Sequence, residues 1–298
     1  MAGKDEVRKY LSAKQGLRAT FTVATHVVRE MQSIQNTYPV ASLAVGRSMV
    51  AAILLASVQK KGQVVSLHFK GDGPLDTFIG EATFEGEVRG YTKNPQLEVP
   101  LIDHKILVGP AIGKGTLTVV RTFGSDPAQK GSVEIQTGEV GDDVAYFLHK
   151  SDQIRSLVTL GVKVNAYGKV EAAGGVLIEL MPDYDEAIVD LLMNNSLKVA
   201  SISELIAAGG GALELKDLFL KDIEVHEIDH PHELTYTCRC SKARLIQAME
   251  LFPVEDLEDI LRKGKEVEAK CEICGRVYEI SLEKIEEIKN KVRKTTLH

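Results

Sequence analysis

The residues best suited to chemistry are four cysteines near the C-terminus, the only cysteines in the chain. One residue separates Cys238 from Cys240, two separate Cys271 from Cys274, and thirty lie between the pairs. Zn²⁺ favours four thiolates in a tetrahedron, and two close pairs can supply them if the chain folds back. The spacing therefore predicts a zinc site made by all four cysteines.

The two pairs differ in their local surroundings. Cys271-x-x-Cys274 is followed by Gly275 and flanked by strand-like residues 267–270 and 277–280, which is typical of a zinc knuckle. Gly275 suits such a turn because glycine tolerates a positive φ.

Cys238-x-Cys240 is a less common half-site. It leads through a capping Ser241 into a predicted helix at 242–249, whose N-terminus favours thiolate. Four thiolates around Zn²⁺ leave about two negative charges. Basic residues that could offset them lie close in sequence: Arg239, Lys242, Arg244, Lys270 and Arg276.

Other chemistries for these residues stay open on spacing alone. A thioredoxin-type Cys-x-x-Cys begins a helix, whereas strand-like residues follow Cys274. A zinc deaminase needs His-x-Glu before its cysteines, and His226-Glu227 and His232-Glu233 lack the intervening residue. His230 or His232 could replace one sulfur, although a solvated loop histidine is the simpler interpretation.

An all-thiolate site is also sensitive to oxidation. Thiolates react with peroxide and hypochlorous acid, and neighbouring sulfurs can resolve into disulfides. Oxidation would remove the metal and, with it, much of the free energy that holds a small domain together. A permanent structural zinc site is the alternative that needs no such reaction.

Residues 1–183, which carry a net charge of +1, mix strand and helix patterns. Residues 63–92 alternate repeatedly between turns and predict an antiparallel meander. Further strands are expected at 18–23, 117–122, 133–137, 158–166 and 176–180, with helices at 25–34 and 142–154. We therefore predict an α+β N-terminal domain with an antiparallel sheet and one long apolar helix that begins at Pro39.

That long apolar stretch, residues 40–58, approaches the length of a membrane span. It contains Arg47 and three serines, so a buried core helix is the better interpretation. The start of the chain, Met1-Ala2-Gly3-Lys4-Asp5-Glu6, is polar and predicts no secretory signal. We therefore expect a cytoplasmic protein with reduced thiols and no membrane partner.

Residues 184–230 form an acidic middle segment with 10 acidic and 3 basic side chains. Asp183 with Glu186, and Ser201 with Glu204, are typical helix starts, and Gly209-Gly210-Gly211 should end a helix. We predict a helical linker of low local stability. Residues 231–298 have few large apolar groups and should form a small domain that needs a metal to fold.

Two further functions find little support. Residues 231–298 carry no net charge, and no region has the basic surface of a nucleic-acid binder. Gly109-Pro110-Ala111-Ile112-Gly113-Lys114-Gly115-Thr116 resembles a phosphate-binding loop, but its spacing is one residue short and a strand follows, so a turn is expected. No nucleophile with a base is recognisable, and we predict no enzyme activity.

Several longer stretches carry a family resemblance. They are Phe21-Thr22-Val23-Ala24-Thr25, Pro39-Val40-Ala41-Ser42 with Gly46-Arg47, Gly86-x-Val88-Arg89-Gly90-Tyr91-x-x-Asn94-Pro95, Gly113-Lys114-Gly115-Thr116-Leu117-Thr118-Val119-Val120-Arg121 and Ala173-Gly174-Gly175-Val176-Leu177-Ile178. With Cys238-x-Cys240-Ser241 and Cys271-x-x-Cys274, the chain resembles the redox-regulated heat-shock holdases, the 33 kDa chaperonin family, over nearly its whole length.

The resemblance implies an ATP-independent chaperone that is inactive when reduced and zinc-bound. On oxidation, Cys238 would pair with Cys240 and Cys271 with Cys274, zinc would leave, and the linker would unfold to expose apolar surface for unfolding client proteins. Members of the family also form homodimers when active. A zinc-ribbon adaptor that binds nucleic acid or protein is the alternative function.

Overall fold

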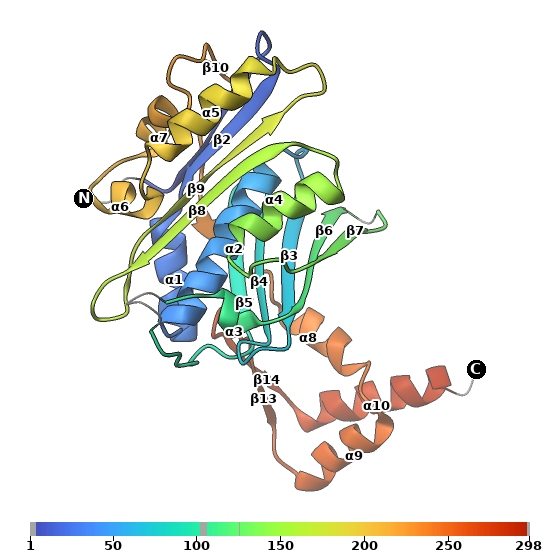
Figure 1. Cartoon of the computed structure of the whole chain (residues 1–298). Helices are drawn as coiled ribbons and strands as arrows, with labels where there is room; N and C mark the ends of the chain where they lie inside the picture. The colour runs from blue at the N-terminus through green and yellow to red at the C-terminus, as the bar shows by residue number, and fades with distance from the viewer. Residues whose placement is uncertain (1–3, 102–105, 125, 297–298) are drawn as a thin grey trace. The chain divides into compact units, whose positions relative to one another are not determined.

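The computed structural model describes residues 4–101, 106–124 and 126–296, and it confirms the α+β class. The chain divides into a first unit, Met1–Thr237, and a second unit, Cys238–His298 (Figure 1). Met1-Ala2-Gly3, part of the polar start, lies outside the described residues.

Two six-stranded sheets form the framework of the first unit. The first sheet has the order β10-β1-β2-β9-β8, with β11 also pairing with β1. Its strands are β1 (Glu6–Ser12), β2 (Leu17–Val23), β8 (Ser156–Val164), β9 (Val170–Leu180), β10 (His226–Glu227) and β11 (His232–Glu233). All of these pairs are antiparallel.

The second sheet has the order β12-β5-β4-β3-β6-β7. Its strands are β3 (Gln63–Gly71), β4 (Thr77–Thr83), β5 (Glu87–Thr92), β6 (Gly115–Phe123), β7 (Gln129–Glu134) and β12 (Thr235–Tyr236). Strands β3 to β5 are the predicted meander. Only the pairing of β12 with β5 is parallel within the described residues, and it places the end of the first unit on an edge of this sheet.

Helix α2 (Pro39–Ser57) is the layer between the two sheets. A Cβ added at Gly80 of β4 would lie 2.3 Å from the carbonyl carbon of Ser48, and one at Gly175 of β9 would lie 2.7 Å from Val50. The helix is long and apolar enough to cross a membrane, but 94% of its most apolar 18-residue stretch is buried. It is therefore the predicted core helix. Helices α1 (Thr25–Gln35), α3 (Gly109–Ile112) and α4 (Gly141–Lys150) complete this part.

The acidic middle segment supplies α5 (Ala187–Leu197), α6 (Ile202–Ala207) and α7 (Ala212–Phe219). Figure 1 shows α5 and α7 along the side of β2 that faces away from α2. These helices and the first sheet share an apolar cluster that is separate from the one around α2. We call it the linker core. Its largest members are Tyr10, Leu17, Phe21, Val176, Ile178, Ile188, Leu192, Ile202, Ile206, Leu215, Phe219, Leu220 and Ile223.

The second unit contains α8 (Lys242–Met249), α9 (Val254–Lys263), β13 (Val267–Lys270), β14 (Val277–Ile280) and α10 (Leu282–Thr296). Ser241 caps α8 by accepting the N–H of Arg244, and Gly264 ends α9 in the left-handed conformation, both as expected. Among the described residues of this unit, the core consists of five buried apolar side chains: Met249, Leu257, Ile280, Ile285 and Ile288. Burial on this scale leaves the unit dependent on another source of stability.

Some local predictions were wrong. The strand expected at 133–137 is β7, which is shifted towards the N-terminus because its polar side chains occupy a sheet edge and give no apolar alternation. The helix expected at 142–154 ends at Lys150. The loop at 109–116 contains the single helical turn α3 before β6 rather than a simple turn.

The helix starts of the middle segment were only half correct. Asp183 does not cap α5: Glu186 occupies the N-cap position, and Asp185 accepts the N–H of Ala187. Ser201 caps α6 as predicted, by accepting the N–H of Glu204 at 3.2 Å.

Candidate metal centre

The four cysteine side chains lie together in the second unit and form what we call the sulfur cluster. All four Sγ atoms are within 4.8 Å of one another. The Sγ atoms of Cys238 and Cys271 are 3.7 Å apart, and those of Cys240 and Cys274 are 3.3 Å apart. Zn–S bonds of about 2.3 Å place the sulfurs of a tetrahedron about 3.8 Å apart. The donor set and its spacing therefore fit one tetrahedral zinc ion.

The turn between β13 and β14 brings Cys271 and Cys274 to one side of the hairpin. The Cys271 N–H donates to the carbonyl of Arg276, and the Gly275 N–H donates to the carbonyl of Cys271, both at 2.8 Å. Gly275 has φ of 71°, so the positive φ predicted for this position is confirmed. These features are those of a zinc knuckle.

Three of the sulfurs have a hydrogen-bond partner outside the set of thiols. Cys238 accepts from the main-chain N–H of Cys240, and Cys274 accepts from that of Arg276. The Oη atom of Tyr278 lies 3.0 Å from Sγ of Cys240. Sequence reasoning missed Tyr278, although two-residue alternation along the strand from Arg276 could have suggested a shared face.

The thiols of Cys238, Cys240 and Cys274 differ in how readily they ionise. Burial raises the pKa of the Cys238 thiol to about 12 and also raises that of Cys274. Burial acts against ionisation of Cys240 as well, but hydrogen bonds from Tyr278 and the other thiols lower its pKa to about 7. One thiolate at Cys240 is thus favoured among four neighbouring sulfurs that cannot all ionise without a counter-charge.

Among the five basic residues proposed to offset the thiolate charge, Arg276 interacts with the charges of Cys240 and Cys274 and forms a hydrogen bond with Tyr278. Arg244 instead donates to the carbonyl of Arg239 at 3.1 Å, which supports the chain at the first cysteine pair. Arg276 is therefore a cation coupled to the sulfurs.

The histidine alternative does not match the geometry. His232 lies in β11 of the first unit, with Nδ1 3.0 Å from the carbonyl oxygen of Phe84 and its ring edge-on to the Phe84 ring. Across the described residues, the sulfur cluster is the group of His, Cys, Asp and Glu side chains close enough to hold a metal.

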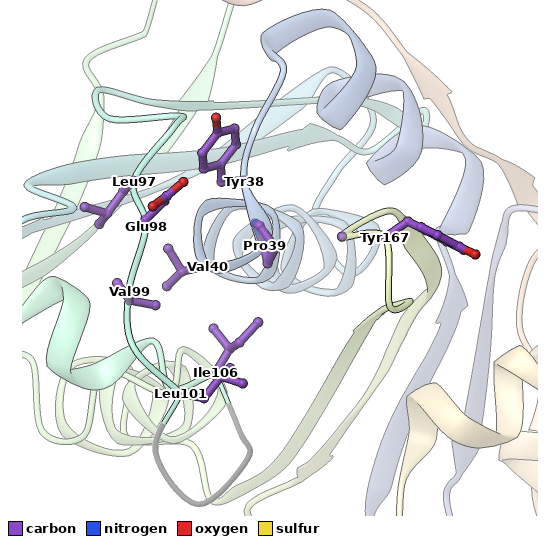
Figure 2. Close-up of a pocket in the computed structure, with 10 residues that line it drawn as sticks. Tyr38, Pro39, Val40, Leu97, Glu98, Val99, Leu101, Ile106 and Tyr167 are labelled. Atoms are coloured by element: carbon purple, nitrogen blue, oxygen red, sulfur yellow. The ribbon is translucent and has the colours of Figure 1, made fainter.

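A separate hollow of about 480 Å³ lies at the start of α2 (Figure 2). The described part of its lining is mostly apolar, and Glu98 is the carboxylate among those residues. Figure 2 shows Val40, Val99 and Ile106 on its walls and Tyr167 at its edge, pointing away. The described lining residues offer apolar contact and do not include a nucleophile with its base.

The fold and the sulfur cluster define a protein with a thiolate metal centre in a small C-terminal unit. A family model described as "Hsp33 protein" matches residues 5–281. The chain is 37% identical over 282 residues to the 33 kDa chaperonin of Thermodesulfovibrio yellowstonii, covering 94% of this chain and 97% of that protein. It is 36% identical over 288 residues to the 33 kDa chaperonin of Synechococcus elongatus, covering 95% and 97%.

A crystal structure of the 33 kDa chaperonin of Thermotoga maritima superposes with a TM-score of 0.87 at 26% identity, covering 98% of this chain and all of that one. The chain belongs to the Hsp33 family. It is a redox-regulated holdase chaperone with a C-terminal four-cysteine zinc site, and it is not an enzyme. The predictions of family, fold class, function and zinc cofactor are confirmed.

Proposed function

We propose that Cys238, Cys240, Cys271 and Cys274 are the zinc ligands of the inactive protein. The observation that carries this proposal is the separation of their four Sγ atoms, all within 4.8 Å of one another. Bound zinc would supply a cross-link between the start of the second unit and the β13–β14 hairpin. With five buried apolar side chains among its described residues, the unit needs such a link to stay folded.

On activation, Cys238 pairs with Cys240 and Cys271 pairs with Cys274. Each disulfide forms when two thiols give up two electrons and two protons to one peroxide molecule, which leaves as two water molecules. Both disulfides together remove all four ligand thiolates. The small core then lacks its cross-link, and the second unit loosens.

Residues 184–230 are the linker, and this segment unfolds next. The segment carries a net charge of −7, and its three short helices are held to the first sheet chiefly through the linker core. After the linker, β10, β11 and β12 attach the chain to sheet edges as far as Thr237, whose N–H donates to the carbonyl of Val88. Cys238 is the next residue, so loosening at the sulfurs acts directly on this attachment.

Release of α5 to α7 would uncover the outer face of the first sheet. Leu17, Phe21, Val176 and Ile178 on that face are at most 1% exposed while the helices cover them. A newly exposed apolar face of this kind suits the apolar segments of unfolding client proteins. The same exposed face can bind a second copy of the chain, so the oxidised protein forms a homodimer. The protein acts in the cytoplasm.

The decisive experiment follows aggregation of a heat-unfolding client by light scattering, with the chaperone either reduced and zinc-loaded or oxidised by peroxide under mild heat. We expect suppression only by the oxidised form, with zinc release and two disulfides found by peptide mapping. Equal suppression by both forms would contradict the switch. The adaptor alternative predicts that zinc removal abolishes binding.

A further inference from the structure

The sulfur of Cys240 has a hydrogen-bond donor of a different kind from those of its neighbours. Cys238 and Cys274 accept from main-chain N–H groups, which every non-proline residue supplies. Cys240 has the side-chain hydroxyl of Tyr278 at 3.0 Å. Of these three donors, the tyrosine hydroxyl can be removed by deleting one oxygen atom.

The direction of that hydrogen bond follows from the state of the sulfur. A cysteine that serves as a zinc ligand carries no proton, so the Tyr278 hydroxyl must donate and Cys240 must accept. Tyr278 is held in place because it lies on β14 opposite Ala269 of β13. Its oxygen also forms a hydrogen bond with Arg276, and a cation there polarises the O–H group and strengthens its donation to sulfur.

We propose that Tyr278, assisted by Arg276, is a positioning residue that slows the oxidation of Cys240 by peroxide. The proposal rests on the function proposed above. A donated hydrogen bond withdraws electron density from the sulfur and occupies one of its lone pairs.

The slowed step is the first one in oxidation. The Cys240 sulfur attacks one oxygen of hydrogen peroxide, the O–O bond breaks, and sulfenic acid and water result once protons are taken up. A neighbouring thiol then attacks the sulfenic sulfur, and a disulfide and a second water form. The hydrogen bond from Tyr278 lowers the electron density that the sulfur has available for the first attack, which raises the barrier of that step.

The test compares wild-type protein with Tyr278→Phe, both full-length, reduced and zinc-loaded. We expect Cys240 in the variant to be oxidised about 5- to 10-fold faster by hydrogen peroxide, measured by differential alkylation and mass spectrometry. Zinc affinity against a chromogenic chelator should fall about tenfold. Tyr167→Phe is the matched control, because Tyr167 is 88% exposed, and it should change neither value.

Arg276→Gln gives a second, independent readout. Arg276 is exposed, so its replacement should leave the unit folded. It should accelerate Cys240 oxidation in the wild-type background and have no effect in the Tyr278→Phe background, because it acts through the tyrosine oxygen. A purely structural role would make the two effects additive.

Two negative results separate the possible failures. If the wild-type protein oxidises and releases zinc but Tyr278→Phe and Arg276→Gln do so at the same rate, the role of Tyr278 is overturned. If the wild-type protein itself neither binds zinc nor forms the two disulfides, the proposed function is wrong, whatever the variants do.

Discussion

The buried ammonium group of Lys9 lies 2.6 Å from the carboxylate of Asp229. The Lys9 side chain is only 4% exposed, and its Nζ also lies 4.9 Å from the centre of the Phe84 ring. Lys9 belongs to β1, whereas Asp229 lies between β10 and β11, at the end of the acidic segment. The first sheet therefore holds the segment that precedes the second unit by a partly buried ion pair.

Replacing Asp229 with Asn should weaken that attachment. Asp229 has φ of 63°, which asparagine also tolerates, so the substitution changes the charge and leaves the backbone unstrained. Asp229 is 59% exposed, and solvent screening limits the expected cost to about 0.5–1 kcal/mol. The amide of Ile228, which donates to the Lys9 carbonyl, should lose about two- to fivefold in hydrogen-exchange protection.

Glu233→Gln is the control for this substitution. Glu233 pairs with Lys4, and both side chains are at least 65% exposed, so the loss of that pair should be nearly silent. Equal loss of protection in both variants would mean that the partial burial of the Lys9 pair has no consequence.

Acid should release the same attachment. The hydrogen bond and charge of Lys9 lower the pKa of Asp229, with smaller contributions from His232 and His230. Because the folded pKa lies below the unfolded value of about 3.9, the stabilisation is complete above that pH and is lost as pH falls through the folded pKa. Ile228 protection factors, corrected for intrinsic exchange, should hold from pH 7 to 5 and fall below about pH 4. Asp229→Asn should lack this pH-dependent loss.

The linker core offers a matched pair of leucines on one helix. Leu215 of α7 is fully buried, while Leu213 is 50% exposed. Leu215→Ala should destabilise α5 to α7 by about 2–5 kcal/mol because it leaves a cavity, and Leu213→Ala by less than about 0.5 kcal/mol. Hydrogen exchange of α7 amides measures both. Oxidised Leu215→Ala protein should also suppress client aggregation at a lower temperature than the wild type. Indistinguishable variants would argue against a packed linker.

Sequence reasoning reached the features whose signals are local. The cysteine pairs, the caps at Ser201 and Ser241, and the glycine stop at Gly264 each depend on a few neighbouring residues, and the structure has them where expected. The apolar stretch of α2 likewise predicts its own burial, since a helix that is apolar on every side has to be covered on every side.

The features that sequence reasoning missed depend on contacts between residues that are far apart in the chain. Strand β1 was not predicted because Lys9 looks solvent-exposed until Asp229, 220 residues later, is placed beside it. Tyr278 looks like one more strand residue until the fold brings Cys240 to it. The boundaries 1–183, 184–230 and 231–298 stay predictions, and the compact first unit runs on to Thr237.

Asn195 is a further test of how the linker is held together. It is buried on α5, and its Nδ2 group donates to the carbonyls of Phe219 at 3.3 Å and Lys221 at 2.9 Å, where α7 ends. Asn195→Ala leaves both carbonyls without this donor and should cost the segment about 1–3 kcal/mol. The neighbouring Asn194 is exposed, and Asn194→Ala should cost little. Urea-dependent hydrogen exchange of α5 and α7 would measure the difference, and equal effects would contradict the bridging role.

Removal of one thiolate tests whether the metal holds the second unit. Cys271→Ser should lower zinc affinity by at least tenfold, because three thiolates and a hydroxyl bind Zn²⁺ less well than four thiolates. Hydrogen-exchange protection should then fall across α8 to α10 and, through Thr237, in α5 to α7, while β3 and β4 keep theirs as an internal control. Ser241→Ala in the same unit should loosen the start of α8 by about 1 kcal/mol with no change in zinc content. Unchanged protection in α9 and α10 of the Cys271→Ser protein would show that the five-residue core is stable without the metal.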